Sequence, residues 1–195
     1  MGRKLGLTRE QVVEAAAEIA DRDGLGALSM ATLASTLGVR SPSLYNHVDG
    51  LSGLRRQLAL HASGVLAAEL AARVDGLDGV EALRAIAEQL RSYARRHPGL
   101  YNSLLPAPTP QEDPELAAAL SEPVTVVATV LVGMDVDPST VIPLIRALRA
   151  SIHGFVDLEL RGGFGLPENI DDSFTTTIDL VIGAIAAHST TGAGS

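Results

Sequence analysis

Near the N-terminus three short segments with helical periodicity follow one another, and each begins at a residue suited to start a helix. Thr8 precedes Gln11 at the spacing of a capping box, and apolar residues then recur every three or four positions. Ser29 stands before a second segment over 30–37, and Pro42 suits the first turn of a third. This arrangement predicts a small core of three helices.

The turn between the second and third segments is the most informative part of this core. Gly38 follows Leu37, and glycine can adopt the positive φ that a tight turn after a helix requires. Two short helices joined by such a turn form a helix-turn-helix. Apolar residues would hold the two helices at their angle, namely Leu33, Leu37, Val39, Leu44 and Val48. The second helix of the pair would then project outward and fit the major groove of DNA.

Several polar residues of the pair are therefore candidates for DNA contacts. Asn46 can make a paired contact with adenine, and Ser43 can bind either a base or a phosphate. Backbone amides at a helix start, together with Tyr, His and Arg side chains, usually fix the register on phosphates. We expect residues 42–47 to form a rigid rod that projects outward from the three-helix core. The candidate DNA-binding residues are Thr32, Arg40, Ser41, Pro42, Ser43, Tyr45, Asn46 and His47.

The rest of the chain predicts an all-α protein of about nine helices in two domains and a tail. Further helices are expected over 51–74, 80–96, 100–105, 114–132, 137–161 and from Asp171 or Asp172 to His188, with a kink or break at Pro123. Residues 124–132 are rich in β-branched side chains and could form a strand, but no partner strand is evident, so a helix is favoured. The expected domains are a helix-turn-helix over 1–52, a helical effector-binding and dimerisation domain over 53–188, and a disordered tail over 189–195.

The charges are unevenly distributed, although the net charge is −8. Residues 1–58 carry seven Lys and Arg against six Asp and Glu, and the remainder carries eight against seventeen. A near-neutral N-terminal segment in an otherwise acidic protein is compatible with one end that faces DNA. The chain has no cysteine, which excludes disulfides and cysteine-based zinc or nucleophile sites.

Other sequence features bear on location and chemistry. The apolar stretches over 124–134 and 180–187 fall short of the roughly 20 residues that a membrane span needs, and the start of the chain does not resemble a signal peptide. We expect a cytoplasmic protein that has no membrane partner. Residues 162–165 are glycine-rich but lie between helices, so they do not make a nucleotide loop, and His153 with Asp157 provides too few ligands for a metal. We therefore expect no metal, no cofactor and no enzymatic activity.

The first part of the chain, from Thr8 to Leu58, resembles the N-terminal domain of TetR-like transcriptional regulators. Leu44-Tyr45-Asn46-His47-Val48 is similar to the Leu-Tyr-x-His-Phe run that closes the family's recognition helix, in which the Tyr and His lie near phosphates. Two positions differ from the family pattern, because Val48 replaces the Phe and Leu51 replaces a Lys that contacts phosphate. We expect Arg40, Arg55 or Arg56 to compensate.

The second half resembles a C-terminal subtype of the same family named for a Trp-His-Gly motif. The similar residues are His97 to Tyr101 and His153-Gly154-Phe155, with Ile152 in the place of the Trp. The resemblance implies a homodimer in which the last two helices and their symmetry mates form a four-helix bundle. It also implies a small-molecule pocket. Pocket residues, each of which could instead be ordinary core, are expected to be Leu90, Tyr93, Tyr101, Leu104, Val127, Leu131, His153 and Phe155.

The predicted function is thus that of a ligand-responsive regulator of transcription. Two-fold symmetry would place two recognition helices roughly 34–36 Å apart on a palindromic double-stranded operator. A largely apolar effector would release the protein, acting as a repressor, from the operator. The other possibility is that the protein activates transcription. The alternative is an all-helical binding protein or enzyme without DNA binding, which Leu51 and the acidic net charge favour.

Overall fold

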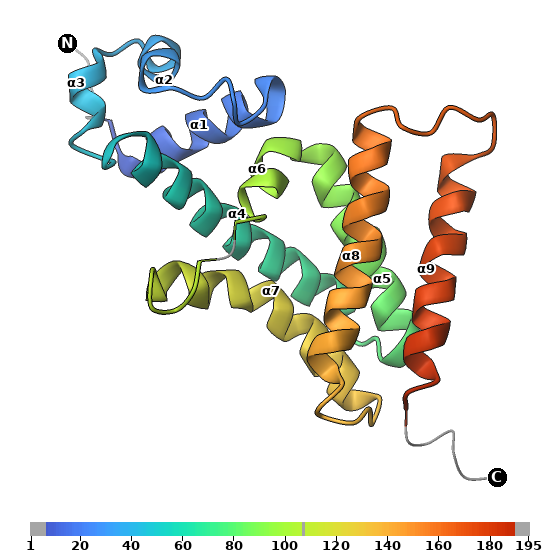
Figure 1. Ribbon diagram of the computed structural model, residues 1–195. Coiled ribbons are helices and arrows are strands. Elements are labelled where there is room, and N and C mark those ends of the chain that lie inside the picture. The colour runs from blue at the N-terminus through green and yellow to red at the C-terminus, as the bar shows by residue number, and fades with distance from the viewer. Residues whose placement is uncertain (1–6, 107, 190–195) are drawn as a thin grey trace, which may run out of the picture. The chain divides into compact units, whose positions relative to one another are not determined.

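The structure is a computed structural model that describes residues 7–106 and 108–189 (Figure 1). Within these two ranges the chain forms nine α-helices and no strand, which confirms the all-α prediction. Packing divides these residues into two compact units. Unit 1 comprises the described residues up to Val65 and those of Arg96–Leu120, and unit 2 comprises Leu66–Arg95 and the described residues from Ser121 onward. The predicted functional boundary after residue 52 stays a prediction, since these units are defined by packing alone.

Unit 1 contains the helix-turn-helix, whose local signals act as predicted. Helix α1 (Arg9–Asp23) has a capping box: the Thr8 hydroxyl accepts the Gln11 N–H at 3.3 Å, and the Gln11 side chain accepts the Thr8 N–H at 3.0 Å. Helix α2 (Met30–Leu37) starts at Ser29, whose hydroxyl accepts the Thr32 N–H at 3.0 Å. Gly38 ends α2 with a φ of +64°, a conformation that favours glycine.

Helix α3 is shorter than predicted, and the expected rod over 42–47 is wrong in this respect. The helix spans Ser41–Leu44, and turns follow from Tyr45 onward. The N–H groups of His47 and Val48 both donate to the Leu44 carbonyl, at 2.9 and 3.1 Å, which tightens the last turn. Helix α4 (Gly50–Val74) begins after these turns.

Helix α6 (Pro98–Ser103) begins two residues earlier than predicted, because Pro98 opens the helix in addition to ending the preceding one. Its N-terminal end lies against α1. The Asp21 carboxylate accepts the Leu100 N–H at 2.9 Å and lies 2.8 Å from His97 Nδ1. A Cβ placed on Gly99 would lie 2.2 Å from the carbonyl atoms of Ala20. The two backbones are therefore in direct contact, with no room for a side chain between them.

Helix α7 (Pro114–Gly133) continues through Pro123, where a kink or break was predicted, and it is a helix along the β-branched stretch as favoured. Proline has no N–H, so the carbonyl four residues earlier, that of Ala119, loses its usual donor. The fully buried hydroxyl of Ser63 on α4 donates to this carbonyl at 2.7 Å. Tertiary contact thus replaces the missing helical hydrogen bond.

The same helix is long and apolar enough to span a membrane by length and composition alone, among the residues described. The sequence expectation that no such stretch exists was therefore wrong. It considered uninterrupted apolar runs and so excluded the part of α7 before Ser121 and Glu122. One helix of this kind is weak evidence for a span. Its distinctive property is that only 11% of its 18-residue apolar stretch is buried.

Unit 2 is built from long helices around an apolar core. Helix α5 (Gly79–Arg96) presents an apolar face, and α8 (Val141–Leu160) packs against α9 (Ile170–Ala186). Arg91 is buried in this core: its guanidinium donates to Glu159 at 2.7 and 2.8 Å, pairs with Asp171 at 2.8 Å, and lies 4.6 Å from the ring centre of Phe174. Buried apolar residues include Leu83, Ile86, Tyr93, Leu131, Leu148, Ile152, Phe155, Ile178 and Ile182.

The starts of the last two helices differ from the sequence prediction. Asp137 does not begin α8; its side chain accepts the Ser139 N–H at 2.8 Å and forms a turn, so that α8 starts later. Asn169 caps α9 by accepting the Asp171 N–H at 2.7 Å, in place of Asp171 or Asp172. Of the predicted tail, Ser189 pairs with Val136 in an isolated bridge, and residues 190–195 lie outside the described ones.

Candidate nucleic-acid interface and effector region

The segment around α3 has one buried side and one exposed side. Leu44 and Val48 are buried in the core of unit 1. Between and before them Pro42, Ser43 and Asn46 are exposed, and Tyr45 is 59% exposed. Although α3 is short, the polar groups predicted to contact DNA are therefore accessible, which the helix-turn-helix prediction requires.

The other predicted contact residues occupy the edge of this surface. Ser41 and His47 are half-buried, and Arg40 is exposed at the N-cap position of α3. The Thr32 hydroxyl lies 2.7 Å from the Ser29 hydroxyl, so it takes part in the cap of α2. Sequence reasoning missed Arg9, which donates to the His47 carbonyl at 3.1 Å across 38 residues of sequence. No local pattern indicates a contact at that separation.

The basic residues proposed to replace the missing lysine have different surroundings. The Arg56 guanidinium binds Asp113 at 2.5 Å and Glu115 at 2.6 Å, and so is engaged within unit 1. That hydrogen bond from Arg56, assisted by the Leu116 N–H, lowers the pKa of Asp113 to about 2. Arg55 is exposed and approaches the Leu25 carbonyl at 3.5 Å. Arg40 is the basic residue that lies on the α2–α3 segment itself.

The charge of the segment is favourable for an anionic partner. Residues 30–48 contain Arg40 and no aspartate or glutamate, although the whole chain carries a net charge of −8. Carboxylates would repel phosphates at the short distances of a groove contact. The α2–α3 segment itself thus contains none of the acidic groups that are abundant elsewhere in the protein.

The eight predicted effector residues fall in both units. In unit 2, Tyr93, Val127, Leu131 and Phe155 are buried, while Leu90 and His153 are half-buried. Tyr101 and Leu104 are buried in unit 1. The ring of Phe155 lies 4.7 Å from that of Phe164 and 5.2 Å from that of Phe174, so it belongs to an aromatic cluster. Sequence reasoning did not anticipate Arg91 in this cluster, because a charged residue on an apolar helix face gives no indication of its distant partner.

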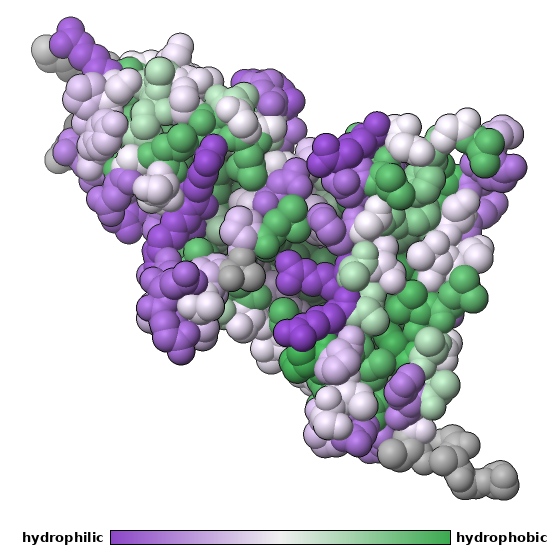
Figure 2. Space-filling model, in the orientation of Figure 1, coloured by the Kyte–Doolittle hydropathy of each residue, from purple (hydrophilic) through white to green (hydrophobic). Residues whose placement is uncertain are grey.

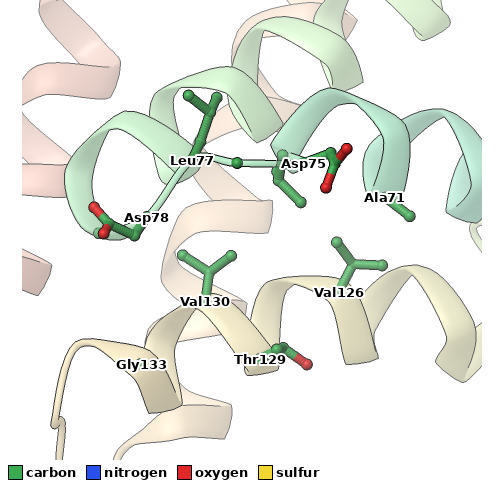
Figure 3. A pocket seen from close by; sticks show the side chains of 11 residues that line it. Ala71, Asp75, Leu77, Asp78, Val126, Thr129, Val130 and Gly133 are labelled. Atoms are coloured by element: carbon green, nitrogen blue, oxygen red, sulfur yellow. The ribbon is translucent and has the colours of Figure 1, made fainter.

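A cavity of about 430 Å³ lies in a different part of unit 2, between the end of α4, the turn that follows it, and α7 (Figure 3). None of the eight predicted effector residues lines it. Val126 and Val130 face the cavity, whereas the next residues, Val127 and Leu131, are buried. The lining residues are Ala71, Val74, Asp75, Gly76, Leu77, Asp78, Gly79, Val126, Thr129, Val130 and Gly133.

An all-helical fold with a capped helix pair, a glycine turn and an exposed polar segment defines a DNA-binding protein of the helix-turn-helix class. Comparison with known proteins makes this specific. Residues 83–181 match the family model described as a tetracyclin repressor-like C-terminal domain. The chain belongs to the TetR-like family of helix-turn-helix transcriptional regulators. The Trp-His-Gly subtype stays a prediction.

Individual relatives agree with this assignment. The chain is 33% identical over 195 residues to an HTH-type transcriptional regulator of Mycobacterium tuberculosis, covering 100% of this chain and 88% of the relative. It is 32% identical over 179 residues to the HTH-type regulator YobS of Bacillus subtilis, covering 91% and 92%. A solved TetR variant from Acinetobacter baumannii AYE in complex with minocycline has the same fold, with a TM-score of 0.69 and 22% identity over 95% of this chain and 99% of that one.

Proposed function

We propose that the protein is a homodimeric repressor that binds a palindromic operator through α3 and the turn after it, and that a small molecule releases it. The observation that carries this proposal is the exposed, carboxylate-free α2–α3 segment on a buried apolar support. Family membership favours a regulator over an enzyme, and a regulator acts where the DNA is, in the cytoplasm.

The docking proposal assigns different roles to the exposed residues. Asn46 and Ser43 would meet base edges in the major groove, and Tyr45 and Arg40 would bind phosphates. Leu44 anchors the segment in the core, and Arg9 fixes its far end through the His47 carbonyl. Since Arg56 is paired with two carboxylates, Arg40 is the better substitute for the lysine that Leu51 replaces.

The dimer proposal rests on apolar surface over α8 and α9, which Figure 2 shows. Ile142 and Leu158 on α8 are each 48% exposed, and Leu180 on α9 is 71% exposed. A two-fold interface would cover these side chains as a four-helix bundle. Two recognition segments would then face DNA sites separated by roughly 34–36 Å.

An effector changes DNA binding only if it binds one conformation of the protein better than the other. The proposed effector is a largely apolar molecule, in keeping with residues such as Tyr93 and Phe155. Minocycline is bound in the Acinetobacter structure, which shares this fold.

The experiment is a mobility shift with DNA from upstream of the protein's own gene, followed by selection from random sequences. Tyr45→Ala should weaken operator binding by about tenfold or more, because one good DNA contact is worth roughly 1–3 kcal/mol. Helicity and dimer mass should not change, since Tyr45 is largely exposed. Leu166→Ala, at a 78% exposed loop residue, is the matched control and should bind as the unmodified protein does.

Two outcomes would refute the proposal. Unchanged affinity of Tyr45→Ala would remove this segment from the interface. Failure to bind any sequence in the selection would instead favour the alternative, an all-helical binding protein that does not contact DNA.

A further inference from the structure

The cavity between α4 and α7 has a shape suited to a small molecule. Its volume of about 430 Å³ is in the range of roughly 300–1,000 Å³ that is usual for such sites. Figure 3 shows Val126 and Val130 pointing from α7 toward the turn that follows α4, with Asp75 and Asp78 at the two ends of the turn. All the lining residues belong to unit 2.

The wall of this cavity is apolar but incompletely covered. Val74, Val126 and Val130 are half-buried, and α7 as a whole is a highly apolar helix of which little is buried. Covering exposed apolar area of this kind lowers the free energy, so it favours the binding of a ligand with an apolar part. The Thr129 hydroxyl donates to the Thr125 carbonyl at 2.9 Å, so its proton is already used.

The charge at the cavity has a single sign. Asp75 and Asp78 are in the lining, and no lysine, arginine or histidine is. Neither carboxylate forms an ion pair with any residue that the structure describes. The arginine nearest in sequence, Arg73, is engaged with Glu88 at 3.1 Å.

Helix ends add to this negative potential. Helix α4 ends at Val74 and α7 ends at Gly133, and both residues line the cavity. Two helix C-termini with partly unpaired carbonyls attract cations. The N-terminus of α5 at Gly79 has the opposite effect, but Glu81 in its first turn offsets it.

We propose that this cavity is a binding site for an amphiphilic organic cation, whose apolar part covers the valine wall of α7 and whose positive end lies in the negative potential that Asp75 and Asp78 create along the turn. An anionic molecule would meet the same carboxylates and helix ends unfavourably. The inference does not rest on the proposed repressor function, because binding is measured on the free protein without DNA.

The test uses two probes of equal chain length and opposite charge, decyltrimethylammonium and decanesulfonate, below their micelle concentrations. Calorimetric titration of the full chain should show that the cation binds at least about tenfold more tightly than the anion. In spectra of valine methyl groups, the cation should shift Val126 and Val130 more than the buried Val127. Equal binding of both probes, or no binding of the cation, would overturn the proposal.

Variants separate this site from general attraction to an acidic protein. Asp75→Asn with Asp78→Asn should weaken cation binding by about tenfold, because the two charges at the site are lost. The matched control, Glu14→Gln with Glu168→Gln, removes the same net charge at exposed residues outside the cavity and should bind as before. If both double variants lose affinity equally, the cation responds only to net charge and the site is refuted. Val126→Ala with Val130→Ala should weaken both probes alike.

Discussion

Two contacts between helices, one in each unit and called joints below, hold their helices together by opposite means. In unit 1, α6 meets α1 through Gly99, where a missing side chain lets the backbones touch. In unit 2, one long side chain, Arg91, reaches from α5 to α8 and α9 and satisfies two carboxylates and an aromatic ring. The joint in unit 1 leaves no space for a side chain at Gly99. The joint in unit 2 depends on the interactions of the Arg91 guanidinium. Substitutions should therefore destabilise the joint in unit 1 by overpacking and the joint in unit 2 by loss of partners.

The largest effect is expected at the unit 1 joint. Gly99→Ala places a methyl group 2.2 Å from backbone atoms of Ala20, which cannot move aside as a flexible side chain can. We expect the free energy of unfolding to fall by about 3 kcal/mol or more, at the upper end of overpacking effects. Urea unfolding, monitored by circular dichroism, measures this free energy.

Gly64→Ala is the matched control for that substitution. Gly64 is an exposed residue within α4, and a Cβ there would meet nothing within 4 Å. Alanine should stabilise the protein by up to about 1 kcal/mol, because it is the better helix former. A Gly99→Ala variant as stable as Gly64→Ala would show that the two backbones are not in contact.

A smaller effect is expected at the unit 2 joint. Arg91→Met leaves Glu159 largely buried, with Arg95 at 3.8 Å as its remaining partner. We expect a loss of about 2 kcal/mol in the free energy of unfolding, less than for a fully unpaired buried charge. Adding Glu159→Met should restore part of the loss, because no buried charge then remains.

The control for this joint is Arg84→Met, which removes an ion pair between α5 and Asp179 at the surface. Surface pairs contribute roughly 0–1 kcal/mol, so little should change. Equal losses for Arg91→Met and Arg84→Met would contradict the view that burial makes the unit 2 joint different.

The smallest effect is an acid-dependent one in unit 1, at the pair of Arg56 and Asp113. Since folding lowers the pKa of Asp113 to about 2 from an ordinary value of 3.8, the carboxylate contributes stability above about pH 4, and this is lost as pH falls toward 2. Asp113→Asn should therefore be less stable than the unmodified protein at pH 6, and the difference in Tm should shrink from pH 4 downward. A difference that is constant with pH would exclude the pair as its source.

The sequence predicted those parts of the fold that depend on neighbours. Thr8 and Gln11 are three residues apart, and Ser29 and Thr32 have the same spacing, so the helix caps were readable from order alone. Gly38 indicated its own turn because few other residues adopt a positive φ. The exposed face of the predicted DNA-binding segment followed from the same local rules.

Errors arose where a local signal competed with a distant partner or with another signal. Pro123 predicted a kink or a break, and the break does not occur: the Ser63 hydroxyl, 56 residues away from Ala119, supplies the missing hydrogen bond. Asp171 looks like a helix cap, but Asn169 stands two residues before it and accepts its N–H. Helix α3 ends at Leu44, and the apolar pattern of this segment does not reveal where the helix stops.

Local order along the chain was sufficient to show that this chain is helical, where the caps of α1 and α2 lie, and which segment has its polar groups exposed. These properties arise within one or two helical turns, over which side chains and backbone groups must meet. Tertiary structure alone decided the joint of Asp21 with His97, the place of Arg91 in the core, and the cavity beside α7, because each brings together residues far apart in the chain whose meeting depends on how whole helices pack.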